Sequence, residues 1–441
     1  MKELGIKNII TGIFVIAAVA ALMVFSGVIK IGTNSQEAQG SITIWGTIES
    51  SVMAPYLSET TGGSINVSYE QKNPASYESD LINAFASGVG PDVFIMSHEY
   101  ILRHTDKILE IPYSSLPRNS YESTYVDEGK LFLTDTGIMA FPLSIDPLVM
   151  YYNKPLISSA FILDIPQYWD EFIAFNPKIT EYNGTGEISI SAVSMGSYDN
   201  VRNAKGLISA LILQNGNTIV GTDPKDSSKF SLLRANTTTR TAAVQALDFY
   251  TSFSRFGSDT YSWNEALIDS QSKFIAGEVA VYFGRASEVE NIRKKNPNLD
   301  FGVELFPQVR ASKTRLTQGD MLGVSVSKQT KNIPAALSVA SSLAGPQVAG
   351  NLAEDLRVAP ARKDLLRDVP DDALRTLVYK SAIISAGWID PAPERTHQLM
   401  RTLITNINTG ALSTQDAIDR ANADLNTILD QTINLTVKRE R

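Results

Sequence analysis

The chain contains no cysteine and little histidine or tryptophan: three His and four Trp in 441 residues. The absence of cysteine excludes disulfides, thiolate metal sites, cysteine nucleophiles and lipid attachment through an N-terminal cysteine. His98 and His104 lack the i,i+4 spacing of a helical metal-binding pair. The sequence therefore predicts neither a metal nor any other cofactor.

Motifs for phosphate binding and for acyl transfer are also missing. There is no G-x-x-x-x-G-K, no G-x-G-x-x-G and no G-x-S-x-G. The formal net charge of -8 is the opposite of the basic face that nucleic acid requires. We therefore expect a protein that is not an enzyme and does not bind nucleic acid, with a glycan-active enzyme as the less favoured alternative.

Charge is absent from residues 9–29, an apolar run of roughly 21 residues, which is long enough to span a bilayer as a helix. Lys2 and Lys7 precede it, a positive-inside bias. We predict a cytoplasmic segment 1–8, a transmembrane anchor 9–29 and a polar linker 30–40. A cleaved signal peptide is the alternative for 9–29. Either way, the rest of the chain lies on the extracytoplasmic side of the cell membrane.

The part after the linker is long enough for two lobes. Short apolar strands at 41–45, 65–69 and 93–96 alternate with helical patterns, which is typical of a parallel sheet covered by helices. A second α/β set follows residue 155. We assign residues 41–144 plus 301–325 to lobe 1, and residues 145–300 plus 326–441 to lobe 2.

The segment 141–155, FPLSIDPLVMYYNKP, has the features of a crossover between two lobes. Pro142 and Pro147 have no backbone N–H to donate, so this stretch is expected to be extended rather than centrally paired. An apolar strand, 148–152, follows and ends at Asn-Lys-Pro. The pattern predicts a hinge.

Seven segments, in order along the chain, resemble motifs of one family. They are ITIW at 42–45, FASGVGPDV at 85–93, the crossover at 141–155, IPQYWDEF at 165–172, FIAGEVAV at 274–281, LGVSVSK at 322–328 and PAR at 360–362. Together they are similar to the extracellular solute-binding proteins of bacterial ABC importers, family 1, the sugar-binding, maltose-binding-protein-like type.

The resemblance implies an α/β, two-lobed, periplasmic-binding-protein-like fold of type II with hinge crossovers, here preceded by one N-terminal transmembrane helix. It further implies that a small solute, with a mono- or oligosaccharide favoured, binds between the lobes and is passed to the transmembrane subunits of an ABC permease. The alternatives are a non-sugar or anionic solute, or a sensor that acts on a receptor.

Polar candidates for the ligand site follow the carboxyl ends of strands, where open parallel sheets bind ligands. They are Glu49 after the first strand, Ser97 after the third, and Ser144 with Asp146 at the crossover. Carboxylates grip sugar hydroxyls through charge-assisted hydrogen bonds. Asp146 can instead be a hinge residue whose carboxylate only accepts hydrogen bonds from backbone N–H groups. Glu49 can instead be an acidic residue that the dipole favours at a helix N-terminus.

Aromatic candidates for stacking on a sugar ring are Trp45, Trp263, Trp388 and Tyr198. Trp388 lies in a late irregular segment, and loop aromatics are often functional. The alternative to a stacking role is burial for Trp45 and an ordinary loop position for Tyr198. We interpret Trp169 as a core-packing residue.

One departure from the family pattern concerns residues 281–287, VYFGRAS, where sugar-binding relatives often carry a stacking tryptophan. Here Arg285 is present instead, and it can either grip an anionic group or begin a helix. The departure keeps the anionic alternative open.

Overall fold

The computed structural model describes residues 40–59, 65–216, 218–223, 229–231, 233, 237–312, 314–368 and 370–440, without the side chains of 237–242 and 435–440. The expected segments 1–8 and 9–29, and the linker up to residue 39, lie outside these residues. Among the helices that are described, none combines the length and the apolar character needed to span a bilayer.

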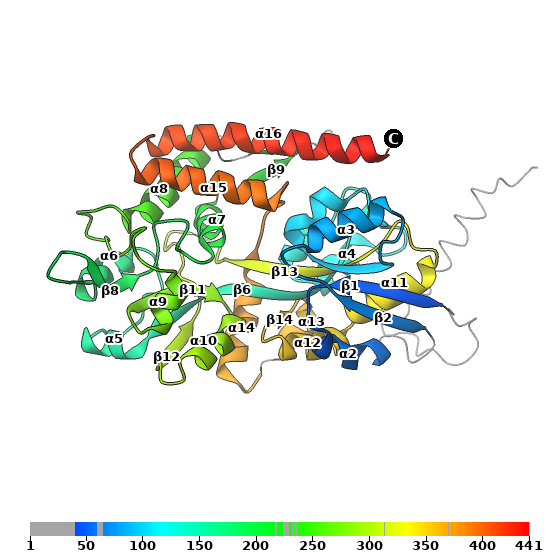
Figure 1. The fold of residues 1–441 in the computed structure, drawn as a ribbon, viewed down its shortest axis with the longest axis horizontal. Helices are drawn as coiled ribbons and strands as arrows, with labels where there is room; N and C mark the ends of the chain where they lie inside the picture. Colours follow the sequence, from blue (N-terminus) through cyan, green and yellow to red (C-terminus); the bar gives the residue numbers. More distant parts are fainter. Residues whose placement is uncertain are drawn as a thin grey trace, which may run out of the picture. The chain divides into compact units, whose positions relative to one another are not determined.

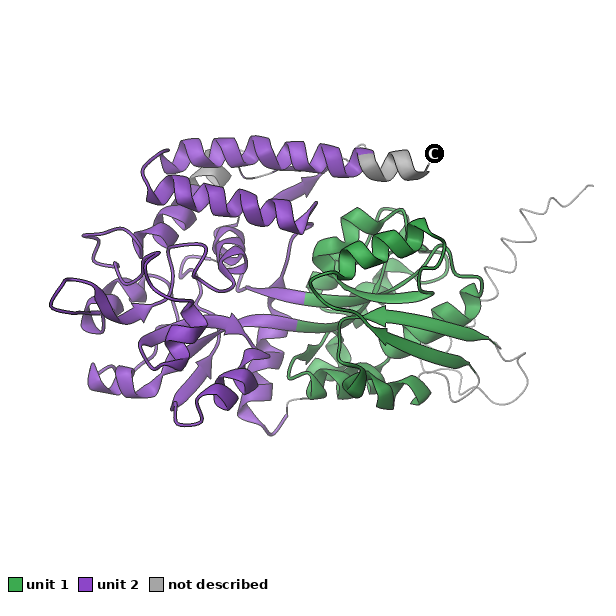
Figure 2. Cartoon of the chain, in the orientation of Figure 1, with its two compact units in different colours: residues 1–145, 321–368, 436–441 green, residues 146–320, 369–435 purple. Residues whose placement is uncertain are grey.

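The chain folds into two compact units, coloured separately in Figure 2. Unit 1 comprises Met1–Ile145, Met321–Asp368 and Thr436–Arg441, and unit 2 comprises Asp146–Asp320 and Val369–Leu435. The backbone passes from one unit to the other within β6 (Phe141–Asn153) and again within β13 (Thr317–Val326). The predicted crossover at 141–155 therefore lies where the chain changes units. The expectation that it is not centrally paired is wrong, because β6 has neighbouring strands on both sides in the sheet.

Unit 1 is built on a sheet in which β1 (Ser41–Gly46) runs parallel to both β2 (Asn66–Gln71) and β3 (Val93–Ser97). The helices α2 (Ser50–Glu59) and α3 (Tyr77–Ala86) connect these strands, as the alternating pattern predicted (Figure 1). β3 also pairs antiparallel with Leu322–Val326 of β13. The sheet ends in β14 (Ala359–Pro360), which pairs with Ser144 and Ile145 of β6.

The core of unit 1 lies between this sheet and two later helices, α11 (Ile333–Leu343) and α12 (Pro346–Asp355). Both helices begin with a proline in the first turn, where its missing N–H costs no hydrogen bond.

The smaller elements of unit 1 are η1 (His98–His104), β4 (Ile111–Pro112), α4 (Arg118–Thr124), η2 (Asp127–Phe132), β5 (Gly137–Ile138) and α13 (Lys363–Leu366).

The division of the chain differs from the expected one in two stretches. Residues 301–320, expected in lobe 1, belong to unit 2, and residues 326–368, expected in lobe 2, belong to unit 1. The reason is strand pairing: β12 (Phe301–Glu304) pairs with Met150–Asn153 of β6. The later segment stays in unit 1 because α11 and α12 bury their apolar faces in its core.

Unit 2 is built on a second stretch of sheet. The later part of β6 pairs antiparallel with β11 (Val279–Arg285), which is parallel to β8 (Ile188–Val193). β8 pairs antiparallel with the edge strand β7 (Glu181–Tyr182). β15 (Ser385–Ala386) pairs with the first residues of β13.

Helices cover the sheet of unit 2 (Figure 1). They are α5 (Lys154–Ser159), α6 (Glu171–Phe175), η3 (Asn176–Lys178), α7 (Ala204–Gln214), α8 (Thr237–Ser252), α9 (Ser270–Ile275), α10 (Glu288–Lys295), α14 (Ala373–Ile383), α15 (Pro393–Asn408) and α16 (Thr414–Glu440), with a hairpin of β9 (Val220–Thr222) and β10 (Lys229–Ser231). α7 is apolar on nearly every side and almost fully buried. Ser413 caps the start of α16, because the Asp416 N–H donates to Ser413 Oγ at 3.1 Å.

Trp169 occupies the aromatic core of unit 2, as expected. It is buried, and its Nε1 donates to Gln214 Oε1 at 2.6 Å. Four phenylalanine rings, Phe172, Phe249, Phe283 and Phe306, have centroids between 5.2 and 5.8 Å from its ring. The conspicuous WDEF motif therefore marks packing rather than a ligand contact.

Candidate functional site

Trp45 and Glu49 lie at the carboxyl end of β1 in unit 1. Trp45 is nearly buried, and Lys72 Nζ lies 3.4 Å from its ring centroid, a cation–π contact. Glu49 is exposed, and its carbonyl accepts the first N–H groups of α2, from Val52 and Met53. The dipole of α2 favours an acidic side chain at this position. The Glu49 carboxylate is also accessible to a solute.

The end of β3 carries Ser97 and His98. Ser97 Oγ accepts the Glu99 N–H at 3.4 Å and so caps η1. His98 is buried, and its Nδ1 accepts the backbone N–H of Met321, the first residue of unit 1 after the crossing in β13, at 3.3 Å. Its Nε2 lies 3.9 Å from Oε1 of Glu128, whose side chain is completely buried. His98 therefore joins the end of β3 to the crossover strand, a role that sequence reasoning missed.

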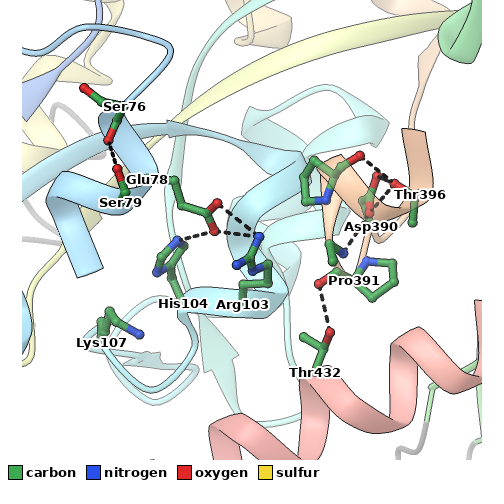
Figure 3. Close-up of polar contacts among 12 residues, drawn as sticks. Ser76, Glu78, Ser79, Arg103, His104, Lys107, Asp390, Pro391, Thr396 and Thr432 are labelled. Carbon is green, nitrogen blue, oxygen red and sulfur yellow. Dashed lines mark hydrogen bonds and ion pairs between the residues drawn. The ribbon is translucent and has the colours of Figure 1, made fainter. Parts of the chain in front are cut away.

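A second polar cluster of unit 1 fixes η1 to α3 (Figure 3). The Glu78 carboxylate accepts from Arg103 Nη1 at 3.0 Å and lies 3.4 Å from His104 Nε2. Burial lowers the pKa of His104, although Glu78 opposes this shift. The imidazole is therefore neutral near pH 7, and the cluster is structural. Across the described ranges, no three His, Asp or Glu side chains are arranged to hold a metal ion.

Ser144 and Asp146 flank the point where β6 changes units. Ser144 is buried and pairs with Pro360 of β14. Asp146 Oδ1 accepts the backbone N–H of Ser287 at 3.1 Å, and its Oδ2 accepts Ser287 Oγ–H at 2.5 Å. Burial raises the pKa of Asp146 to about 6, against the opposing effects of Arg285 and Ser287. The structure thus shows the backbone-satisfying role of Asp146, and its ligand role stays a prediction.

Arg285 ties together the two strands in which the chain changes units. Its Nη1 donates to the carbonyl of Asp146 in β6 at 3.0 Å and to that of Gln318 in β13 at 3.2 Å. Both bonds use one guanidinium nitrogen, Nη1, and they hold the side chain between β6 and β13.

Gln318 was missed by sequence reasoning. Its side chain is buried, and its Oε1 has no hydrogen-bond partner among the residues that the structure describes. A Cβ atom at Gly206 in α7 would come within 2.8 Å of this oxygen, so the close approach requires glycine there. An unsatisfied buried acceptor is costly, and a hydroxyl donor from a solute would remove that cost.

Glu288 organises the end of β11, where no aromatic face is exposed. Its carboxylate accepts from Tyr282 Oη at 2.5 Å, Asn203 Nδ2 at 3.0 Å and the Arg285 N–H at 2.9 Å. Tyr282 and Phe283 are themselves buried. The missing tryptophan of this segment is therefore not replaced by another ring from β11.

Tyr198 and Trp263 are core residues of unit 2. Tyr198 Oη lies 3.0 Å from His397 Nδ1, and the two rings meet edge to face. Trp263 is 0% exposed, and its Nε1 donates to Asn200 Oδ1 at 3.0 Å. Trp263 has no exposed face for a solute in this structure, because the segment around it is folded into the unit. The sequence could not distinguish this tryptophan from Trp388.

Trp388 is buried, with 6% of its surface exposed, and lies beside an ion pair in unit 2. Its Nε1 donates to Ser209 Oγ at 3.1 Å, and Lys205 Nζ lies 5.6 Å from its ring centroid. Lys205 Nζ is 2.5 Å from Asp390 Oδ2. The Asp390 carboxylate also accepts from Thr396 Oγ1 (Figure 3). An indole next to charged hydrogen-bonding groups is suited to a ring that carries hydroxyls.

These two α/β units, with polar side chains at strand ends and at the crossings, define a binding protein. Residues 51–376 match the sequence model of the family described as bacterial extracellular solute-binding protein. The chain belongs to this family. A search of curated protein sequences finds no match.

Solved structures of solute-binding proteins share the fold. The sugar-binding protein MalE from Xanthomonas citri is 18% identical, with a TM-score of 0.71 over 90% of this chain and 99% of that one. A cyclo/maltodextrin-binding protein complexed with maltotetraose is 15% identical, with a TM-score of 0.71 over 91% and 99%. An ABC substrate-binding protein from Listeria monocytogenes in complex with cycloalternan is 15% identical, with a TM-score of 0.67 over 89% and 99%. The expected two-lobed fold is confirmed.

Proposed function

We propose that this chain is the extracytoplasmic solute-binding component of an ABC importer, and that it captures a mono- or oligosaccharide for delivery to the permease. The likeness to proteins solved with maltotetraose and with cycloalternan, over nearly the whole described chain, carries the carbohydrate assignment.

Candidate ligand contacts are proposed for each unit by itself. Unit 1 supplies Trp45, Glu49, Ser97 and Ser144 at strand ends, and unit 2 supplies Asp146, Gln318 and Trp388. The carboxylates and the Gln318 amide would accept sugar hydroxyls, and an indole would cover the apolar face of a ring.

The N-terminal segment 9–29 is proposed as a single-pass anchor that keeps the binding units on the extracytoplasmic face. Its support is the uncharged length of the segment and the preceding Lys2 and Lys7. Intact-mass measurement of the membrane-extracted protein tests this proposal, because cleavage would remove this segment.

The proposed function is tested with purified residues 33–441 in a thermal-shift screen, followed by titration calorimetry. The panel contains maltodextrins, other oligosaccharides, monosaccharides, sugar phosphates and amino acids. At least one neutral sugar is expected to raise the melting temperature and to bind with a measurable heat. A response confined to charged solutes, or no response to any solute, would contradict the proposal.

Trp388→Ala is expected to weaken binding of that sugar by about 10- to 100-fold, since a ring–sugar contact is worth roughly 1–3 kcal/mol. The measurement is the calorimetric Kd at a temperature where the variant remains folded. Trp263→Phe is the matched control, because it changes a buried tryptophan of the same unit and should lower stability without changing Kd. Equal Kd values for Trp388→Ala and the wild type would exclude the stacking role.

A further inference from the structure

Three aromatic side chains gather on the surface of unit 2, away from the candidate site. They are Tyr182 in β7, Phe256 in the segment after α8, and Tyr261 in the same segment, and together they are called the aromatic platform. Phe256 is 85% exposed and Tyr182 is 50% exposed. Burying such rings on folding would have been favourable, so their exposure is a feature that needs a cause.

The rings of the aromatic platform are arranged in a regular way. Tyr182 and Tyr261 are nearly parallel, with an interplanar angle of 11° and a centroid distance of 6.3 Å. Phe256 stands at 77° to Tyr261 with a centroid distance of 5.6 Å. The parallel pair and the upright ring form a corner that has two aromatic walls.

Hydrogen bonds hold the platform in place. Tyr182 Oη donates to the Tyr261 carbonyl at 3.1 Å, which Asn176 Nδ2 also reaches at 3.3 Å. Asn264 Nδ2 donates to Tyr261 Oη at 2.8 Å. The next residue, Ser262, is buried and bonds to the carbonyl of Val193 in β8. The rings are therefore presented by a fixed backbone, so little conformational entropy is lost when a ligand binds.

Polar groups border the rings. The turn directly after Tyr182 holds Asn183, Thr185 and Glu187, which are exposed and bonded to one another. Aromatic faces bordered by amide, hydroxyl and carboxylate groups match the chemistry of a glycan, which has apolar C–H faces and a rim of hydroxyls. A protein partner would call for a much larger apolar area than three rings.

We propose that the aromatic platform is a second, surface site that binds glycan chains by ring stacking. β7 is the edge strand of the unit 2 sheet, at the end opposite β6, the strand that holds Asp146. The platform is therefore separate from the candidate solute site in the same unit. A weak site of this kind gains effective affinity on a polymer, where repeating units offer many equivalent positions. It would keep the protein close to the polysaccharide from which its soluble ligand is released.

The test is native affinity electrophoresis of residues 33–441 in gels that contain soluble starch, xylan or mannan. At least one polymer is expected to slow the wild type relative to a polymer-free gel. Tyr182→Ala with Phe256→Ala should raise the apparent Kd for that polymer at least tenfold. Tyr182→Phe, which keeps the ring, should retain most of the retardation.

Phe161→Ala with Leu163→Ala is the matched control, since both side chains are highly exposed in unit 2 and neither takes part in an aromatic pair among the described residues. This control should migrate like the wild type.

Absence of retardation by all three polymers, or equal retardation of the platform variant and the wild type, would overturn the proposal. Loss of retardation in Trp388→Ala but not in the platform variant would also overturn it, because the polymer would then bind at the solute site. The thermal shift caused by a free sugar is read separately and should be unchanged in the platform variant, so failure of the platform and failure of the proposed function remain distinguishable.

Discussion

An Asp146→Asn variant should lack the loss of unfolding free energy that ionisation of Asp146 causes in the wild type as the pH rises from about 4 to 7. Burial raises the pKa of Asp146 from 3.8 to about 6 in the folded protein. Between these two values the folded state holds a proton that the unfolded state has released. Ionisation of Asp146 therefore costs the folded state up to about 3 kcal/mol by pH 7.

Urea denaturation followed by circular dichroism, repeated across this pH range, measures the effect. Asp164→Asn is a suitable control because it removes an exposed carboxylate from the same unit. The difference in unfolding free energy between wild type and Asp146→Asn should grow with pH, whereas that for the control should stay flat. Parallel pH profiles for Asp146→Asn and the wild type would contradict the burial of a titrating carboxyl at the crossover.

The same variant separates the two roles of Asp146. If its carboxylate also accepts a sugar hydroxyl, the asparagine variant should bind the solute about tenfold more weakly at pH 7, because a hydrogen bond to a charged group is worth roughly 1.5–3 kcal/mol. Calorimetric titration gives the answer. An unchanged Kd would leave Asp146 with only its bonds to Ser287.

Trp169→Ala should lower the stability of unit 2 by about 3–5 kcal/mol. The substitution opens a cavity among four phenylalanine rings and leaves Gln214 Oε1 without its donor. Gln214 also donates from Nε2 to the carbonyls of Pro307 and Leu316, both at 2.8 Å. The damage should therefore extend to the segment that leads into β13.

Chemical denaturation of the wild type and of Trp169→Ala measures this loss. Trp169→Phe preserves most of the ring volume but not the N–H donor, so it should cost less than the alanine variant. A loss below about 1 kcal/mol for Trp169→Ala would mean that the surrounding rings collapse into the space without penalty.

The local elements of the fold could be predicted because they depend on short-range patterns. The alternation of strands and helices up to Ser97 and the packing role of Trp169 both follow from neighbours in the sequence. The placement of residues 301–320 and 326–368 does not, because it depends on strand partners and on helix packing between segments far apart in the chain. β12 and the later part of β13 are both short apolar runs, yet one pairs with β6 and the other with β3.

The position of the crossover was predictable, but the contacts made there were not. The prolines of the crossover placed Asp146 where the chain changes units, but its partner Ser287 lies 141 residues away. Arg285, Gln318 and His98 owe their roles to backbone groups brought near them by the fold. Burial was equally out of reach, since Trp263 and Trp388 are both buried and differ only in the side chains that surround them.

The interleaving of the two units has a consequence for protein engineering and for gene evolution. Because each unit is assembled from separate stretches of chain, no single DNA fragment encodes either unit completely. Exchange of one unit for that of a relative needs matched joins near residues 145, 320, 368 and 435. Recombination at one point would leave a hybrid in which at least one unit mixes strands from two parents, so new solute specificities in such a chain are more readily acquired by substitution than by shuffling.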